Sequence, residues 1–280
     1  MKEKSLKDRL ALWVKEFIHS HAAFDGRKSE EILEADIAES KTLFNKELPK
    51  RKAKESIESF QTKDGLNLSY WFVEKPSNTM LKVLIHGSGS NFAKADRAVY
   101  LLDQGFNVAM ISYRGHSGNP GHADQKTIIR DVKETIENVM SLGYKQKDIY
   151  LEGSSLGTCS LVHALDRIYQ KDNELFAGVL LKAAPLDLDT QDKYTLESLQ
   201  KHKLSYSEAQ DFIQRTWNQK EVYSRLKAKE ILIVHGKDDD VVPVGHAQAI
   251  YDLLQVNNHN IELKLIDKEG HRLDLNQYGL

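Results

Sequence analysis

The chain has 280 residues, of which 39 are Lys or Arg and 41 are Asp or Glu, so its formal charge at pH 7 is −2. This balance gives no global field that would attract nucleic acid or an anionic membrane, and no nucleic-acid partner is expected. A chain of this length with 40% hydrophobic residues can form one large α/β domain and an extension. Its longest apolar runs fall well short of the about 18 residues that span a bilayer.

The first segment, residues 1–56, is rich in charge and almost free of Gly and Pro, and it predicts an N-terminal helical extension. Its first helix carries Leu10, Trp13 and Phe17 on one face. Two interpretations stay open. The helices pack on the main domain as an added layer, or they dock a membrane surface or a protein, for which Trp13 and Phe17 are suitable residue types.

Two further features concern the compartment. The start of the chain alternates charges and does not resemble a secretory signal. The one cysteine, Cys159, cannot form an internal disulfide, and we expect it to be a small buried side chain. A cytoplasmic location is therefore expected.

From Phe60 onward, strand and helix patterns alternate, beginning with a hairpin around the turn Asp64-Gly65. Later strands are predicted at 81–85, 106–111, 149–151, 176–181, 231–234 and 261–266. Helices are predicted to end near 104 and to span 124–142 and 246–254, with another after residue 155. Strands separated by helices indicate a mostly parallel sheet covered by helices on both faces, in which function collects at the carboxyl ends of the strands.

The stretch 148–160, D-I-Y-L-E-G-S-S-L-G-T-C-S, contains a G-x-S-x-G pentad centred on Ser155. An apolar strand precedes the pentad and an amphipathic helix follows it. A nucleophilic serine at such a sharp turn is held in dihedral angles that most residues avoid. Gly153 and Gly157 remove side chains that would collide there. The pattern predicts a nucleophile elbow with Ser155 at its tip.

Two Gly-containing turns follow other strands. His86-Gly87-Ser88-Gly89 lies where backbone N–H groups turn toward a developing oxyanion, and the predicted donors are the amides of Ser88 and Leu156. His86 itself is expected to brace the loop. The second turn, 113–118 (Y-R-G-H-S-G), is expected to brace the floor of the site through its Arg and polar groups.

Partners for the serine come from the last two strands. The segment 235–243, H-G-K-D-D-D-V-V-P, supplies three candidate acids, and Gly270-His271 supplies a histidine. The order Ser155, acid, His271 is the chain order of one group of serine hydrolases. His235, His246 and His259 fit the role of the base less well.

Together these motifs resemble the α/β-hydrolase superfamily from about Ile57 to the C-terminus, and within it the small monoacylglycerol-lipase-like and depalmitoylase-like serine hydrolases. The resemblance implies an α/β-hydrolase domain over 57–280 and selects Asp239, the fifth position of H-G-x-x-D-x-x-V-P, as the acid. It also implies that the polar insertion at about 186–217 is a helical lid. Thr158 departs from the second Gly that many lipases have after the pentad.

The expected function is hydrolysis of carboxylic esters or thioesters through a Ser155–His271–Asp239 triad and an acyl-enzyme. The substrate would be a small-molecule or lipid acyl ester, with no cofactor and no metal. Peptidase activity and acyl transfer use the same triad and stay open, as does a non-catalytic binding module on the same fold. Haloalkane or epoxide chemistry would need a carboxylate at position 155.

Overall fold

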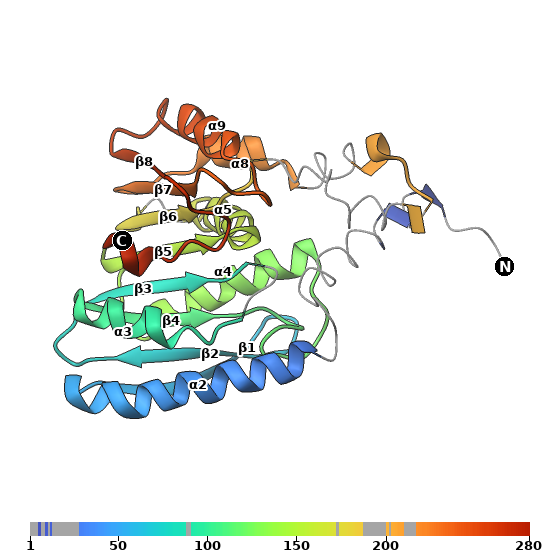
Figure 1. Cartoon of the computed structure of the whole chain (residues 1–280). Helices are drawn as coiled ribbons and strands as arrows, with labels where there is room; N and C mark the ends of the chain where they lie inside the picture. The colour runs from blue at the N-terminus through green and yellow to red at the C-terminus, as the bar shows by residue number, and fades with distance from the viewer. Residues whose placement is uncertain are drawn as a thin grey trace.

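The computed structural model describes residues 5–6, 9–10, 12, 28–87, 91–171, 174–186, 200–201, 203–209 and 217–280. Within these ranges, eight strands form one sheet in the order β1-β2-β4-β3-β5-β6-β7-β8 (Figure 1). β2 is antiparallel to β1 and to β4, and every other neighbouring pair is parallel. The predicted hairpin and mostly parallel sheet are confirmed.

The strands are β1 (Lys54–Gln61), β2 (Asn67–Glu74), β3 (Met80–Ile85), β4 (Phe106–Ile111), β5 (Ile149–Ser154), β6 (Gly178–Lys182), β7 (Ile231–Gly236) and β8 (Ile261–Ile266). The α-helices are α2 (Lys28–Arg51), α3 (Ala95–Asp103), α4 (Gln125–Ser141), α5 (Leu156–Tyr169), α8 (Gln219–Arg225) and α9 (Gly245–Leu254). Two short 3₁₀ turns are η1 (Gln146–Asp148) and η2 (Leu275–Tyr278).

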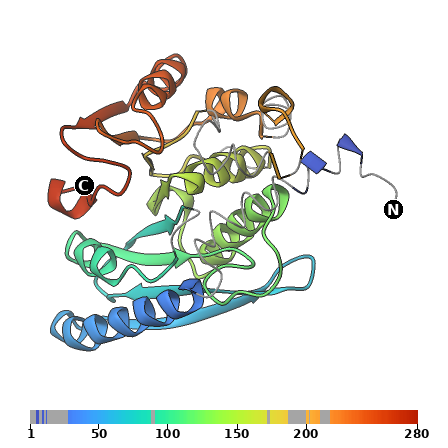
Figure 2. The same cartoon turned by 45° about the vertical axis from the view of Figure 1, so that its right-hand side comes forward.

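Helices cover both faces of the sheet, as predicted. Buried apolar side chains of α4, α5, α8 and α9 form the larger core cluster with one face. Side chains of α2 and α3 pack on the other face, and α2 runs beside β1 and β2 in both views (Figures 1 and 2). Because the parallel strands are buried on both faces, they appear in the sequence as short continuous apolar runs.

Aromatic packing attaches α2 to the sheet. The ring of Phe44 meets Trp71 edge-on at 5.1 Å between centroids, and Trp71 meets Phe92 at 5.6 Å. The guanidinium of Arg51 forms two hydrogen bonds of 2.8 Å with the carboxylate of Asp103 in α3. The strand β1 begins at Lys54, inside the residues predicted as the extension. Helix α2 is therefore continuous with the packed domain.

Several predicted features lie outside the described residues. They include Trp13 and Phe17 of the first helix and most of the lid segment at 186–217. Of that segment, Leu186, Leu204 and Trp217 are described, and all three are buried in the larger core cluster. No described helix has the length and apolar composition needed to cross a membrane.

The packing of α2 gives a first test. We expect Phe44→Ala to lower the free energy of unfolding by about 3–5 kcal/mol, because Phe44 is 1% exposed and its loss leaves a cavity against Trp71. Urea unfolding followed by tryptophan fluorescence measures this change. The neighbouring Asn45→Ala is the control, since Asn45 is exposed, and its change should stay within about 0.5 kcal/mol. Equal effects of the two variants would show that α2 is not held by this contact.

Candidate active site

Ser155 lies at the turn between β5 and α5, where its backbone has φ 52° and ψ −125°. Side chains with a Cβ rarely adopt a positive φ, so the surrounding contacts must hold this conformation. The N–H of Ser155 donates to the carbonyl oxygen of Lys182 on β6 at 2.9 Å. Its own carbonyl accepts from the backbone N–H of Thr158 at 2.9 Å and from Thr158 Oγ1 at 2.7 Å. Thr158, where many lipases have Gly, therefore fastens this turn.

The two glycines of the pentad are required by close backbone packing. A Cβ on Gly157 would lie 2.5 Å from the carbonyl oxygen of Ile85 at the end of β3, and a Cβ on Gly153 would lie 2.9 Å from Cα of Thr158. The start of α5 is thus pressed against the end of β3. This contact places Ser155 above the carboxyl edge of the sheet.

A similar contact brings the last two loops together. A Cβ on Gly236, at the end of β7, would lie 2.2 Å from the carbonyl oxygen of Glu269 in the loop after β8. The N–H of Asp238 donates to that same carbonyl at 2.9 Å. Gly236 was not among the predicted site residues, although its position at the end of a buried strand was a usable signal. This contact sets the loop of Asp239 beside the loop of His271.

The structure brings Ser155, His271 and Asp239 into one hydrogen-bonded chain. His271 Nε2 lies 3.0 Å from Ser155 Oγ, and His271 Nδ1 lies 2.8 Å from Asp239 Oδ2. Asp238 and Asp240 are exposed, whereas Asp239 is buried. His246 Nδ1 accepts from the N–H of Leu186, and His259 is exposed. The geometry therefore joins Ser155 to the acid and the histidine that the motifs selected.

His235, which the sequence analysis treated as a poorer candidate base, contacts the acid directly. Its Nε2 lies 3.1 Å from Asp239 Oδ2 and 2.7 Å from the carbonyl oxygen of Val242. Both of these oxygens only accept hydrogen bonds, so Nε2 carries the proton and donates. The other carboxylate oxygen, Oδ1, accepts from the N–H groups of Val241 and Val242 at 2.9 and 2.8 Å. Four donors thus surround Asp239.

These donors keep Asp239 ionised. Burial alone would raise the pKa of Asp239, but the hydrogen bonds from His235, His271 and the Val242 N–H outweigh burial and hold this pKa well below its ordinary range. An ionised carboxylate orients the ring of His271 and fixes a proton on its Nδ1. The Nε2 of His271 is then free to accept the hydroxyl proton of Ser155.

The histidine of the β3 loop has a different role. His86 Nε2 is 2.9 Å from Ser112 Oγ and its Nδ1 is 2.7 Å from the carbonyl oxygen of Gly87, and Tyr113 OH donates to the His86 carbonyl. Burial lowers the pKa of His86 to about 3, with a smaller contribution from His116. A buried neutral imidazole tied to its own loop braces that loop.

The predicted oxyanion donors are only partly described. Leu156 is the first residue of α5, so its N–H belongs to the free N-terminal turn of that helix. Ser88 lies outside the described residues. In the 113–118 turn, Arg114 is buried, and its Nη2 lies 2.6 Å from Asp131 while its Nη1 lies 2.8 Å from Asp64. Cys159 is buried, as expected, and burial raises the pKa of its thiol to about 12.

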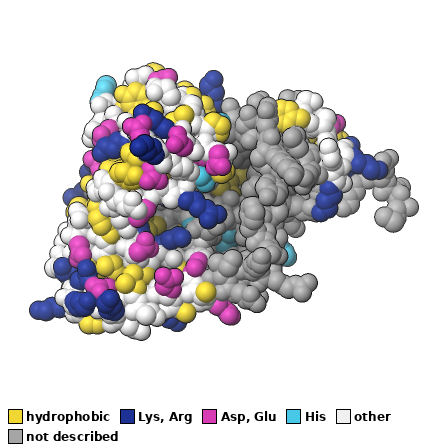
Figure 3. Space-filling model, viewed as in Figure 1, with side chains coloured by type: hydrophobic (Ala, Val, Ile, Leu, Met, Phe, Trp, Pro, Cys, Tyr) yellow, Lys and Arg dark blue, Asp and Glu magenta, His cyan; other side chains and the backbone are white. Residues whose placement is uncertain are grey.

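A cavity of about 780 Å³ opens beside Ser155 and His271. Its walls come from the end of β3, from α3 and from the segment after His271. Figure 3 shows a hollow near the middle of this face, with Lys, Arg and His side chains at its edge. Within the described ranges, no three His, Cys, Asp or Glu side chains are grouped to hold a metal ion.

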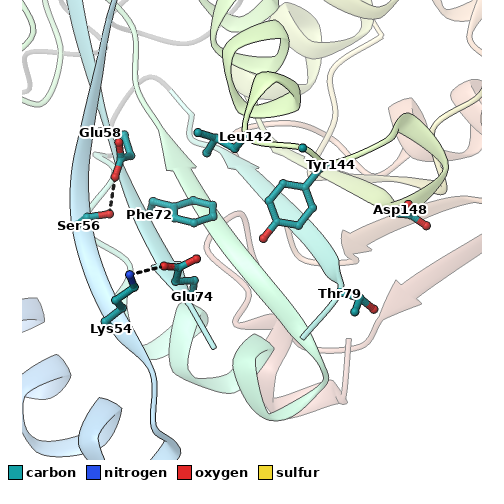
Figure 4. Close-up of a pocket in the computed structure, with 10 residues that line it drawn as sticks. Lys54, Ser56, Glu58, Phe72, Glu74, Thr79, Leu142, Tyr144 and Asp148 are labelled. Carbon is teal, nitrogen blue, oxygen red and sulfur yellow. Dashed lines mark hydrogen bonds and ion pairs between the residues drawn. The ribbon is translucent and has the colours of Figure 1, made fainter. Parts of the chain in front are cut away.

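A second pocket of about 540 Å³ lies beside β1 and β2 (Figure 4). Phe72 and Tyr144 line this pocket. Two pairs of its polar side chains contact each other, Lys54 with Glu74 and Ser56 with Glu58. None of the predicted site residues borders this pocket. The cavity at Ser155 is therefore the candidate active site.

Comparisons with known proteins show which family and which proteins this chain is similar to. Residues 93–279 match the model of the family described as the prolyl oligopeptidase family. The chain is 25% identical over 206 residues to the Escherichia coli K12 protein YfhR, covering 71% of this chain and 68% of that protein.

Solved structures show the same fold. The esterase Pf2001 of Pyrococcus furiosus aligns with a TM-score of 0.61 and 20% identity, over 80% of this chain and 87% of that chain. An acylaminoacyl peptidase aligns with a TM-score of 0.60 and 16% identity, over 79% of this chain and 38% of that chain. The predicted α/β-hydrolase fold is confirmed.

The close packing at the elbow gives a second test. Gly157→Ala would force a methyl group against backbone oxygens that cannot rotate away, and we expect it to lower the free energy of unfolding by about 1–3 kcal/mol. Chemical denaturation measures the loss. Gly245→Ala is the matched control, because a Cβ there meets nothing within 4 Å. An unchanged free energy of unfolding in Gly157→Ala would mean that α5 does not pack against β3 as described.

A third test concerns His235 and Asp239. We expect His235→Phe to lower the free energy of unfolding by about 1.5–3 kcal/mol at pH 7, since a buried carboxylate loses a donor, and His235→Gln to lower it less. The folded-state pKa of Asp239 is depressed, so this stabilisation is complete above the unfolded pKa of about 4 and is lost as pH falls toward the folded value.

Guanidinium unfolding at pH 7, 5 and 2.5 measures both effects. The difference between His235→Gln and His235→Phe, neither of which carries the imidazole, should be equal at pH 7 and 5 and smaller at pH 2.5. A difference that grows as pH falls would contradict a bond to the ionised form of Asp239.

Proposed function

This chain belongs to the prolyl oligopeptidase family, and we propose that it is a serine hydrolase that cleaves carboxylic esters or thioesters, with Ser155 as nucleophile, His271 as base and Asp239 as acid. The observation that carries the proposal is the hydrogen-bonded chain from Ser155 Oγ through His271 to Asp239, at a turn with a positive φ. A buried carboxylate with four donors and a strained serine are costly features in a purely structural site.

In the proposed mechanism, His271 Nε2 takes the hydroxyl proton as Ser155 Oγ attacks the carbonyl carbon. The N–H of Leu156, at the start of α5, and that of Ser88 would stabilise the oxyanion. When the tetrahedral intermediate collapses, the bond to the leaving alcohol or thiol breaks and His271 returns its proton to that group. Water, deprotonated by His271, then attacks the acyl-enzyme and releases the acid.

The esterase and the acylaminoacyl peptidase align over 80% and 79% of this chain, so both classes of enzyme share its fold. The sequence motifs favour ester cleavage. The motifs H-G-S-G, Y-R-G-H-S-G, G-S-S-L-G and H-G-K-D-D-D-V-V-P support a place near the monoacylglycerol-lipase-like and depalmitoylase-like enzymes. Peptidase activity is the second candidate, favoured by the family itself.

The proposal is tested by labelling with a fluorescent fluorophosphonate and by hydrolysis of 4-nitrophenyl esters. Loss of such a nucleophile or base typically lowers kcat by a factor of ~10⁶, and loss of the acid lowers it by ~10⁴. We therefore expect no detectable labelling or ester hydrolysis by Ser155→Ala and His271→Ala, and very little by Asp239→Asn. Ser141→Ala, an exposed serine at the end of α4, is the control and should label like wild type. Labelling that survives Ser155→Ala would refute the assignment.

Matched 4-nitroanilides separate the two candidate functions. An esterase should hydrolyse the esters and leave the anilides of the same acyl groups almost untouched. Comparable kcat/KM values on peptidyl anilides would favour the peptidase.

A further inference from the structure

Beside Ser155, the cavity floor is a stretch of the sheet that carries charged residues. In the register of β5 and β6, Ser154 is opposite Lys182, and side chains alternate along a strand, so Glu152, Ser154 and Lys182 share one face. Ser154, Ser155 and Lys182 all line the cavity. Arg97 reaches the same floor from α3, which covers this face.

This floor holds more positive than negative charge. Glu152 is buried, and its Oε2 already contacts Arg97 Nη2 at 2.6 Å and Lys82 Nζ at 3.7 Å. Burial would raise the pKa of Glu152, but the charges of Arg97 and Lys82 outweigh it and lower the pKa, so this carboxylate is ionised. The basic side chains of Lys82, Arg97 and Lys182 therefore surround one anion, and burial lowers the pKa of both lysines.

Two donor groups on this floor are not satisfied by described protein atoms. The ammonium of Lys182 has three protons, and the contact described for it is one hydrogen bond of 2.9 Å to the carbonyl oxygen of Leu273. Burial lowers the pKa of Lys182, and the charges of Glu152 and Asp274 oppose this effect. Arg97 is 7% exposed, and its buried Nε has no described hydrogen-bond partner. Lys182 Nζ therefore keeps donor capacity beside Ser155 that a bound anion would use.

The mouth of the cavity differs from its floor. Four carboxylates, Asp96, Asp240, Glu269 and Asp274, stand there with Lys94 and Arg272. All but Glu269 of these six are exposed, so water and salt screen their charges. The charges of the floor are screened much less, so they act more strongly on a group bound next to Ser155.

We propose that the floor around Lys182 and Arg97 binds a carboxylate of the substrate. This inference rests on the proposed function and narrows it to esters or thioesters that carry a negative charge on the acyl group or on the leaving group. The Lys182 ammonium donates to that carboxylate, and the buried guanidinium of Arg97 adds positive charge beside it. Neutral esters of the same length are poorer substrates because they leave the protons of Lys182 Nζ unpaired.

Three esters test the proposal: 4-nitrophenyl hexanoate, which is neutral; mono-4-nitrophenyl adipate, charged on the acyl side; and 3-carboxy-4-nitrophenyl hexanoate, charged on the leaving side. In the wild type, kcat/KM for one of the charged esters should exceed that of the neutral ester by about tenfold to a hundredfold. The preferred ester identifies the side that carries the charge. A neutral ester that is hydrolysed as well as both charged esters would overturn the proposal.

Variants of Lys182 locate the effect. Lys182→Met should lower kcat/KM for the preferred charged ester to the level of the neutral ester, and Lys182→Arg should retain part of the preference. Lys220→Met, at an exposed lysine of α8, is the matched control and should keep the wild-type ratio. A preference that survives Lys182→Met would overturn the role of this ammonium. If Lys182→Met does not fold, the ratio of kcat/KM between the charged and neutral esters in the wild type still tests the proposal.

Fluorophosphonate labelling of Ser155 separates this inference from the function on which it rests. If wild-type protein is labelled but shows no preference for a charged ester, only the carboxylate subsite is refuted. If folded protein is not labelled, both the proposed hydrolase function and the subsite are refuted.

Discussion

The contact between Gly157 and the end of β3 is the constraint on which the site depends. It removes the space for a Cβ at the start of α5 and holds Ser155 at a φ that serine rarely adopts. The energy that this conformation costs is offset by the hydrogen bonds of Ser155 to Lys182 and Thr158, and by the buried strands on either side of β5. The serine hydroxyl is thereby fixed before any substrate arrives.

The same packing principle assembles the rest of the site. Gly236 lets the loops after β7 and β8 touch, and the carboxylate of Asp239 then meets donors from both loops. Its depressed pKa follows from those donors, with His235 as a second histidine on the same oxygen that orients His271. Three segments, centred on residues 155, 239 and 271, are separated in sequence and meet because their strands end at one edge of the sheet.

Much of this arrangement was accessible from the sequence. The apolar runs predicted the strands to within a few residues, and the turn signals placed Ser155, Asp239 and His271 at strand ends. The pairing of β2 with β4 was not predicted, because strand order depends on long-range packing that no local pattern carries. The second bond to Asp239 was also missed, since His235 appeared only as a histidine flanking the acid.

The charged floor was missed for a related reason. Lys82, Glu152 and Lys182 each appear as a single charged residue in an otherwise apolar strand, and the sequence alone does not show that β3, β5 and β6 are neighbours. Once the topology is known, these three residues lie together on one face of the sheet, and this arrangement motivates the proposed carboxylate subsite.

The central claim is that Ser155 is an activated nucleophile, and peptide mapping after fluorophosphonate treatment tests it most directly. Intact-mass spectrometry should show one adduct per chain, and tandem spectra should place it on Ser155 within the 148–160 segment, with labelling lost on prior denaturation. An adduct on another residue, or none in folded protein, would contradict the account.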